Sequence, residues 1–381
     1  MSGARELLDA HHKLDHESRN RGGRVFISNW YCEHPFADSV LSTGYSPTLT
    51  ARELLPYYFQ NDDHRLHAQI ADFHESKGEG RLKTDNIFVT AGLSPLITAQ
   101  ILLLKRRGVK RIFYVRPLYY TYYFLAETLG IELVPLNSDP LLNDSIAVRL
   151  PHEHAQYLLL CDPVWYLGRN ISHASIDAIR SWQLSTGGVV LVDGAFQYQR
   201  WTGNDQPEPT YRLVAKQTIR NMCPTKAVAV HGVRFAYAIV PPEWREELRY
   251  CYANTSGSGA AFDKSAASSI MRWLNGSNSN TPLLDYIHRR YDSLTRHSYI
   301  VDSIGAAASY FIFVSVPVPA DQLITMDQRF FDATCYPGQV RLNLLLPTED
   351  LVTYMQLAAA ALGKEARPPA EYLHEIGPSS V

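Results

Sequence analysis

The stretch Cys223-Pro224-Thr225-Lys226-Ala227-Val228-Ala229-Val230-His231-Gly232-Val233-Arg234 decides how this chain is interpreted. It places a lysine directly after a small hydroxyl residue and ends in Gly-x-Arg. This arrangement suits a lysine that holds an aldehyde cofactor as a Schiff base, with the hydroxyl and the arginine beside a phosphate. The amine must be neutral to attack an aldehyde, and a nearby arginine lowers its pKa. Because lysines at such positions are also common on surfaces, the interpretation depends on the rest of the chain.

Upstream of this stretch, runs that favour strands alternate with helical patterns. The strand-like runs cover residues 86–90, 111–115, 131–136, 157–161 and 188–192. Strands separated by helices of this length indicate βαβ units and a mainly parallel sheet. Ligands bind such sheets beyond the carboxyl ends of the strands, and Gly92, Pro117, Asp162 and Asp193 all follow predicted strand ends. We therefore expect an α/β fold with a site at that edge.

The pattern changes after about residue 245, where strands and helices no longer alternate strictly. We expect an N-terminal arm with part of a small domain over 1–45, a large cofactor-binding domain over 46–245, and a small α+β domain over 246–381. In the last of these, Thr348 is predicted to be the N-cap of a helix that ends at Gly363. The tail after Gly363 is predicted to be loosely held.

Composition narrows the class of protein. With 381 residues, 46% of them hydrophobic, the chain can bury a large core. A net charge of -2 gives no general attraction to nucleic acid or to a membrane surface. Five widely spaced cysteines without a CxxC pair indicate a reducing compartment. We find no signal peptide and no membrane span, and the histidine pairs 64/67 and 152/154 lack a third ligand. The expectation is a cytoplasmic protein without a metal.

Five further runs carry recognisable residue patterns. They are Leu66-His67-Ala68-Gln69-Ile70-Ala71, Gly92-Leu93-Ser94, Pro117-Leu118-Tyr119, Val192-Asp193-Gly194-Ala195-Phe196 and Val340-Arg341-Leu342. Together with the lysine stretch, they resemble the motifs of the fold-type I pyridoxal-phosphate enzymes, particularly the class I/II aminotransferases. Those motifs are L-R-x-x-I-A, a glycine turn, P-x-Y, D-x-A-Y, S-x-S-K…G-x-R and V-R-[IL]. The resemblance covers Tyr57 to Leu362, with His67 in place of an arginine, and implies that family's fold: a large domain with a mainly parallel sheet plus a smaller α+β domain.

The resemblance implies a role for each matching residue. Lys226 would bind pyridoxal phosphate as a Schiff base and then move the Cα proton. Asp193 would pair with the pyridine nitrogen, and Tyr119 would stack on the ring. Arg341 would grip the α-carboxylate of the substrate in a bidentate pair. The cofactor phosphate would be bound by Leu93, Ser94, Thr225 and Arg234, with Cys223 at the first serine of the lysine motif.

Two positions depart from the family pattern. Trp165 stands where the family motif N-P-x-N-P-T-G has its second asparagine, and Phe196 stands at the tyrosine of D-x-A-Y. In the family these two residues donate to the phenolic oxygen of the cofactor. Without them we expect a Schiff base with a raised pKa, unless the Trp165 indole, Gln197 or Tyr198 supplies a donor. A local misalignment by one or two residues is the alternative.

The sequence leaves the reaction open. The first reading is an aminotransferase that acts on an α-amino acid with a 2-oxo acid partner. The second is a specialised biosynthetic enzyme that catalyses elimination, replacement, cyclisation or oxidation. A non-catalytic regulator that binds pyridoxal phosphate is the third.

Aromatic residues near the predicted site suggest further contacts. Trp30 is placed where an N-terminal arm would cover the site and contact substrate. Tyr58, or its neighbour Tyr57, is placed to reach the partner subunit of a homodimer, and Ser256 and Ser258 could add phosphate contacts across that interface. His231 is interpreted as a structural residue.

Overall fold

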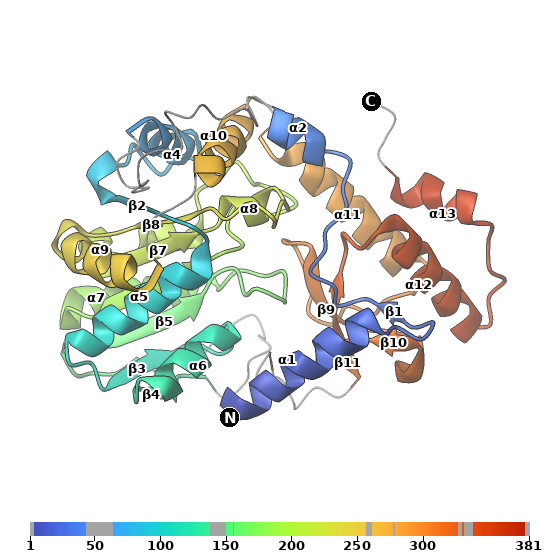
Figure 1. Cartoon of the computed structure of the whole chain (residues 1–381), viewed down its shortest axis with the longest axis horizontal. Coiled ribbons are helices and arrows are strands. Elements are labelled where there is room, and N and C mark those ends of the chain that lie inside the picture. The colour runs from blue at the N-terminus through green and yellow to red at the C-terminus, as the bar shows by residue number, and fades with distance from the viewer. Residues whose placement is uncertain are drawn as a thin grey trace.

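The chain is described by a computed structural model that covers residues 4–42, 64–137, 150–154, 156–256, 261–276, 279–326, 330 and 338–377. Figure 1 shows two parts side by side: a large sheet wrapped by helices, and a smaller part that carries the C-terminal helices. The residues predicted to form the large domain include the whole of the large sheet. The division of the chain at residues 45 and 245 stays a prediction.

The large sheet has seven strands in the order β2-β8-β7-β6-β5-β3-β4. They are β2 (Ile87–Thr90), β3 (Arg111–Tyr114), β4 (Glu132–Pro135), β5 (Tyr157–Cys161), β6 (Val189–Gly194), β7 (Thr218–Met222) and β8 (Ala236–Ile239). Within this sheet, as far as the structure describes it, β8 alone runs in the direction opposite to the other strands. The mainly parallel sheet is therefore confirmed, and β7 and β8 are strands that the sequence analysis did not predict.

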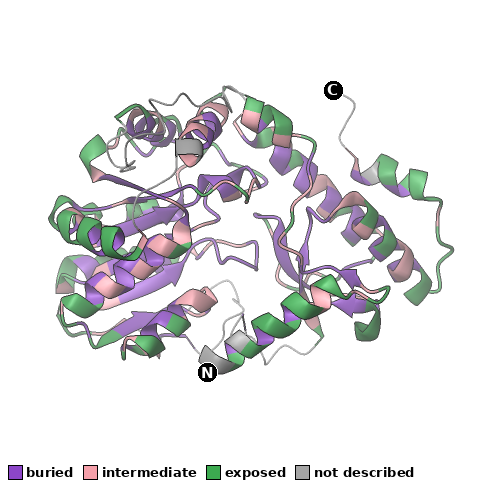
Figure 2. Cartoon of the chain, viewed as in Figure 1, coloured by how far each residue is buried: buried purple, intermediate pink, exposed green. Residues whose placement is uncertain are grey.

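Helices cover both faces of this sheet. On one face lie α5 (Leu93–Arg106), α6 (Tyr120–Thr128) and α9 (Pro242–Ser256), and α7 (His173–Thr186) lies on the other. Alternate residues of β5 point to opposite faces, as in any strand: Leu159 packs in the core on the α5 side, and Leu158 packs with α7. Burial on both faces explains why β5 and β6 are continuous apolar runs. Figure 2 shows these strands almost wholly buried.

The smaller part contains two short sheets. Strand β9 (Phe311–Ser315) pairs antiparallel with β11 (Gln339–Asn343), and β1 (Val25–Phe26) pairs parallel with β10 (Leu323–Ile324). The N-terminal segment is therefore joined to the C-terminal part, and α1 (Ala4–Arg19) packs against both α6 and β10 along one edge of the molecule (Figure 1).

The remaining helices complete the two parts. The α-helices are α2 (Ala37–Ser42), α4 (His64–Ser76), α8 (Pro224–Ala227), α10 (Ala261–Leu274), α11 (Thr281–Arg296), α12 (Thr348–Ala361) and α13 (Pro369–Ile376). Short 3₁₀ turns cover Thr84–Asn86, Pro209–Arg212, Ala215–Gln217 and Ala320–Gln322. The predicted boundary at residue 245 falls within α9, which packs on α5.

Two predictions for the C-terminal region are wrong. Thr348 is the first residue of α12, whose N-cap is Pro347, and its hydroxyl donates to Glu33 Oε1 at 2.6 Å. The tail after Gly363 is not loose over residues 369–376, where it forms α13. Tyr372 and Ile376 lie four residues apart on one face of α13 and are both buried, and such spacing gives a short helix an apolar face to pack.

Candidate active site

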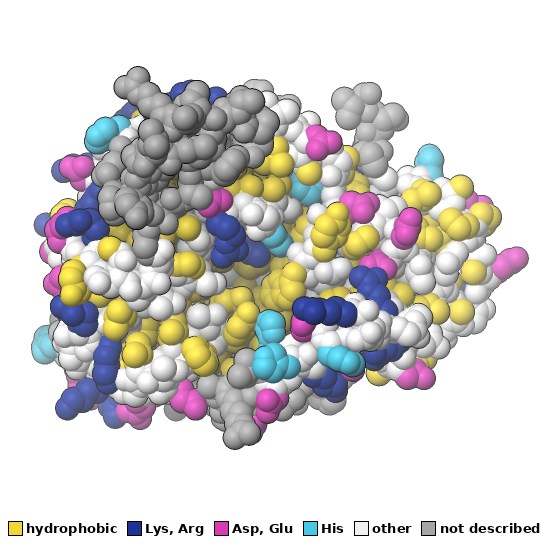
Figure 3. Space-filling model, viewed as in Figure 1, with side chains coloured by type: hydrophobic (Ala, Val, Ile, Leu, Met, Phe, Trp, Pro, Cys, Tyr) yellow, Lys and Arg dark blue, Asp and Glu magenta, His cyan; other side chains and the backbone are white. Residues whose placement is uncertain are grey.

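The carboxyl ends of five strands of the large sheet meet at one cavity. Residues that follow β2, β3, β5, β6 and β7 line it, as expected for ligand sites in sheets of this kind. The lining residues are Trp30, Gly92, Leu93, Ser94, Ile97, Tyr119, Trp165, Asp193, Ala195, Phe196, Cys223, Thr225, Lys226, His231, Val233 and Arg234. In the space-filling view, hydrophobic side chains gather in the hollow between the two parts of the molecule (Figure 3).

Lys226 lies in α8, a short helix that directly follows β7. Pro224 is its first residue, a position where the missing N–H of proline costs nothing. The amine lies 5.8 Å from the ring centroid of Trp30 and 5.7 Å from that of Phe196. Burial lowers the pKa of Lys226, and the charges of Arg341 and Arg234 lower it further. A buried lysine of lowered pKa is suited to act as a nucleophile.

An anion-binding corner lies where β2 turns into α5. Gly92 is the residue before this helix of 14 residues and has a φ of 94°, a conformation that favours glycine. The Arg234 guanidinium packs so closely against Gly92 that an added Cβ would lie 2.7 Å from Nη2. Leu93 and Ser94 are the first residues of α5, and the free N–H groups of a helix N-terminus attract anions. The N-terminus of α5 and the Arg234 guanidinium therefore meet beside Gly92.

Asp193 is a buried carboxylate at the end of β6. It accepts a hydrogen bond from the backbone N–H of Ala195 at 3.1 Å. Burial raises the pKa of Asp193 to about 6, although the Ala195 N–H and the charge of Lys226 act in the opposite direction. A carboxylate held in this way is suited to pair with a cationic ring nitrogen.

Aromatic side chains form the walls of the cavity. The rings of Trp30 and Trp165 are nearly parallel, with an interplanar angle of 11° and centroids 6.1 Å apart. Tyr119 stands edge-on to Trp165 at 5.4 Å, and its hydroxyl donates to that of Tyr120 at 3.0 Å. Phe196 also lines the cavity, so the predicted positions of Trp165 and Phe196 do lie at the site.

Arg341 lies on β11 and is not one of the residues that line the cavity, but it contacts Trp30, which is. Its guanidinium contacts two aromatic rings, with Cζ 3.9 Å from the centroid of Trp30 and 4.2 Å from that of Phe311, and these rings are at 84° to each other. Nη2 donates to the carbonyl of Ser28. Nε and Nη1 are buried and have no hydrogen-bond partner among the residues that the structure describes. Nε and Nη1 lie on different edges of the guanidinium, so a bidentate pair with a carboxylate would use Nη2 together with one of them.

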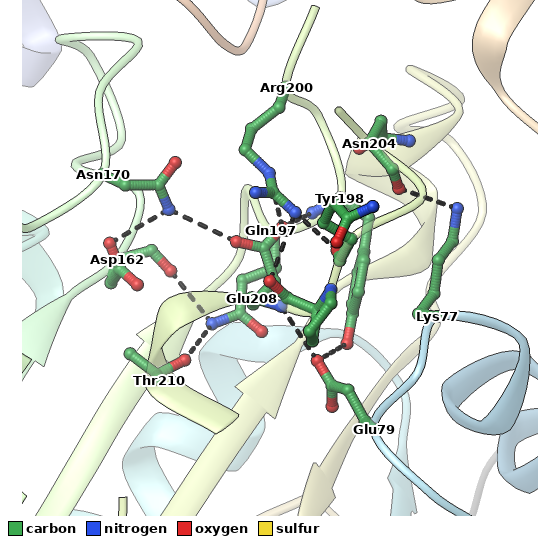
Figure 4. A network of polar contacts seen from close by, with 12 residues as sticks. Lys77, Glu79, Asp162, Asn170, Gln197, Tyr198, Arg200, Asn204, Glu208 and Thr210 are labelled. Atoms are coloured by element: carbon green, nitrogen blue, oxygen red, sulfur yellow. Dashed lines mark hydrogen bonds and ion pairs between the residues drawn. The ribbon is translucent and has the colours of Figure 1, made fainter. Parts of the chain in front are cut away.

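Gln197 and Tyr198 do not supply the donors that were considered for the cofactor oxygen. The chain turns after Ala195, and this turn directs Phe196 into the cavity and the next two side chains into a buried polar network (Figure 4). Gln197 Nε2 donates to the carbonyl of Asp162 at 3.1 Å, and the Tyr198 hydroxyl donates to Glu79 Oε1 at 2.8 Å. The prediction that Gln197 or Tyr198 donates to the cofactor oxygen is therefore wrong.

Other predicted residues divide into three groups. Tyr57, Tyr58 and Ser258 lie outside the described residues, and Ser256 ends α9 without lining the cavity. His231, which was interpreted as structural, does line the cavity. Over the described ranges, the structure contains no cluster of three or more His, Cys, Asp or Glu that could hold a metal ion. In the same ranges no helix is both long and apolar enough to cross a membrane.

The cavity fits pyridoxal phosphate in the chemistry of its groups. It offers a buried amine for the aldehyde in Lys226, a buried carboxylate for the ring nitrogen in Asp193, and an arginine beside a helix N-terminus for the phosphate. Aromatic walls suit the flat ring.

Comparisons with known proteins identify the family and the fold. The family model for aminotransferase class I and II matches residues 48–332. No curated protein matches the sequence. Among solved structures, the chain is similar to N-succinyldiaminopimelate aminotransferase from Mycobacterium tuberculosis, with 17% identity over 91% of this chain and 96% of that one and a TM-score of 0.73.

Two other structures have the same fold. The aspartate aminotransferase of Rhizobium meliloti is 15% identical over 94% of this chain and 96% of that one, with a TM-score of 0.75. YbdL of Escherichia coli, described as having a methionine aminotransferase function, is 14% identical over 91% of this chain and 96% of that one, with a TM-score of 0.74. These likenesses confirm the predicted fold. With the family match over most of its length, the chain belongs to the class I and II aminotransferases, a family of pyridoxal-phosphate-dependent fold-type I enzymes.

Proposed function

We propose that this enzyme transfers the amino group of an α-amino acid to a 2-oxo acid, with Lys226 as the residue that anchors the cofactor. One observation carries the proposal: a buried amine, a buried carboxylate and an arginine at a helix N-terminus line a single cavity. When bound, pyridoxal phosphate supplies an electron sink for the carbanion formed at Cα of the amino acid.

The residues of the cavity then have distinct tasks. Arg234, the N–H groups of Leu93 and Ser94, and the hydroxyl of Thr225 bind the phosphate; Cys223, whose Sγ lies 3.2 Å from Thr225 Oγ1, packs beside them. These contacts hold one end of the cofactor in a fixed place, so that its reactive end stays beside Lys226.

Three further residues act at the reacting end. Asp193 holds a proton on the ring nitrogen, and Tyr119 packs against the ring. Arg341 binds the α-carboxylate of the amino acid through one edge of its guanidinium, on which one of the unpartnered donors lies beside Nη2, and fixes how Cα is presented. The Lys226 amine takes the proton from Cα, a task for which its lowered pKa suits it.

A second reaction class is favoured by one observation. Trp165 and Phe196 line the cavity at the two positions where the family has donors to the cofactor oxygen. Other groups beside this oxygen would change the pKa of the bound cofactor. This change supports the alternative of specialised elimination, replacement, cyclisation or oxidation. Product analysis separates these reactions from transamination.

We further propose a cytoplasmic homodimer with shared active sites. Support for the dimer comes from the family, in which a tyrosine near the position of Tyr58 reaches the neighbouring subunit. Support for the compartment comes from the widely spaced cysteines. Light scattering of the purified protein tests the dimer, and a monomer at micromolar concentration would contradict it.

The first test is an absorption spectrum of the purified protein with added pyridoxal phosphate, with Lys226→Ala as the control. We expect a band from the lysine-bound cofactor in the wild type and its loss or alteration in the variant. A panel of amino acids is then added, and the one that bleaches the band identifies the substrate. An identical spectrum in the variant would show that Lys226 is not the anchor.

A further inference from the structure

Side chains hold all four consecutive backbone carbonyls of residues 28–31. Arg341 donates to the first of them, and Asn343 donates to the second and the fourth at 3.1 and 2.9 Å. The third, the carbonyl of Trp30, lies 2.9 Å from Nδ1 of His231. The segment that carries Trp30 is therefore fixed by contacts to its backbone, whatever its own side chains do.

His231 differs from the other two side chains in where it comes from. Arg341 and Asn343 lie on β11, in the same part of the molecule as the Trp30 segment. His231 lies five positions after Lys226, in the loop that leads to β8 of the large sheet. Of the three side chains, it is thus the one that links the Trp30 segment to the Lys226 loop.

The second ring nitrogen of His231 makes another contact to the smaller part. Nε2 lies 2.7 Å from the hydroxyl of Tyr310, the residue before β9. A carbonyl can only accept, so Nδ1 must carry the hydrogen. Burial lowers the pKa of His231 well below its usual range, and the charge of Lys226 adds to this, so the ring is neutral. Nε2 consequently accepts from the Tyr310 hydroxyl, and both partners are satisfied by one tautomer.

Trp30 lies close to both Lys226 and Arg341. Its ring centroid lies 5.8 Å from the lysine Nζ and 3.9 Å from the arginine Cζ. Phe311 contacts the same guanidinium, and its ring is nearly perpendicular to that of Trp30, with the two centroids 5.6 Å apart; the two rings therefore form adjoining walls beside Arg341. A shift of Trp30 would therefore loosen the plane in which a bidentate pair forms.

We propose that His231 is a positioning residue that fixes Trp30 against Arg341 and so sets the affinity for the carboxylate of the amino acid substrate. The proposal rests on the proposed function, because it takes Arg341 as the carboxylate ligand. It assigns no proton transfer to His231, whose ring is held as a neutral donor to one group and acceptor from another.

Four variants separate the two hydrogen bonds. In His231→Asn, the amide nitrogen lies near the place of Nδ1 and keeps a donor for Trp30. In His231→Gln, the amide oxygen can reach the place of Nε2 and keeps an acceptor for Tyr310. His231→Ala loses both bonds, and Tyr310→Phe removes only the bond to Nε2.

We expect KM for the amino acid to rise about tenfold in His231→Ala and His231→Gln, the effect of losing one hydrogen bond that fixes a binding group. KM should stay within about twofold of wild type in His231→Asn and Tyr310→Phe, and kcat should change little in any variant. Equal KM values in His231→Asn and His231→Ala, or no rise in either His231→Ala or His231→Gln, would overturn the proposal. Should the alanine variant fail to fold, the contrast between asparagine and glutamine still decides.

A readout that needs neither cofactor nor turnover is the ring nitrogen NMR spectrum of protein labelled in its histidines. The His231 signals are those missing in His231→Asn, and we expect a neutral ring with hydrogen on Nδ1 at pH 6 to 8. Hydrogen on Nε2 would contradict the geometry. A wild type without a cofactor band signals failure of the proposed function, whereas a normal band with unchanged KM values signals failure of this inference alone.

Discussion

Glu79 carries a negative charge in the interior of the protein. Its side chain is fully buried and its two oxygens accept from Arg220 Nη1 and Nη2 at 2.8 and 3.2 Å. They also accept from His74 Nδ1 at 2.9 Å, the Tyr198 hydroxyl at 2.8 Å and the backbone N–H of Glu208 at 3.1 Å. Figure 4 shows part of this network. A buried carboxylate is tolerated only with such complete pairing.

Glu79→Gln keeps the shape of the side chain and removes the charge. The Arg220 side chain is only 7% exposed, so the substitution leaves a buried cation without its counter-ion. We expect a loss of about 3–5 kcal/mol in the free energy of unfolding. The matched control is Glu75→Gln, which breaks an ion pair with Arg81 between side chains that are 53% and 58% exposed. An exposed pair of this kind contributes at most about 1 kcal/mol.

The assay is urea unfolding of both variants and the wild type at pH 7, without cofactor. Neighbouring Arg220 lowers the pKa of Glu79 despite its burial. A carboxylate of lowered pKa contributes stability that is complete above its unfolded value of about 4.5 and is lost as the pH falls. The difference in the free energy of unfolding between wild type and Glu79→Gln should therefore become smaller below pH 4.5. Similar losses in Glu79→Gln and Glu75→Gln at pH 7 would refute the reasoning.

Four other perturbations have defined outcomes. Burial raises the pKa of Asp162 from 3.8 to about 7, so its contribution to stability falls as the pH rises through that window. Asp162→Asn should gain stability relative to wild type between pH 4 and pH 8 in urea titrations, and a constant difference would contradict this. Gly92→Ala should weaken pyridoxal phosphate binding about tenfold in absorption titrations, because the new Cβ displaces Arg234 and strains the turn. An unchanged affinity would contradict a phosphate site beside Gly92. Arg341→Lys should lower kcat/KM about a hundredfold, since one ammonium cannot replace a bidentate pair; a loss under fivefold would argue against a carboxylate ligand. Finally, the Lys226-bound cofactor should titrate at a higher pH than in ordinary aminotransferases, and an ordinary acidic pKa would show that its oxygen has donors.

Much of the fold could be read from the sequence because its signals are local. Apolar runs such as 157–161 and 188–192 must be buried on both faces, and helical patterns between them leave few topologies for a parallel sheet. Turn residues such as Gly92 mark the strand ends, where the sheet collects its ligands. Strand β7 escaped prediction because Arg220 and Asn221 interrupt its apolar pattern. Tertiary partners, and not local preference, bury these two residues.

Tertiary structure alone decided which way side chains point and which distant segments meet. The sequence places Phe196, Gln197 and Tyr198 side by side, yet a turn directs the first into the cavity, the second toward Asp162 and the third toward Glu79. Likewise, nothing local shows that His231 holds the carbonyl of Trp30, 201 residues away. Periodicity and turn chemistry are encoded in neighbouring residues, and they determined the sheet, the site edge and the motif residues. Contacts between remote segments depend on how whole elements pack, and only the folded chain determines those.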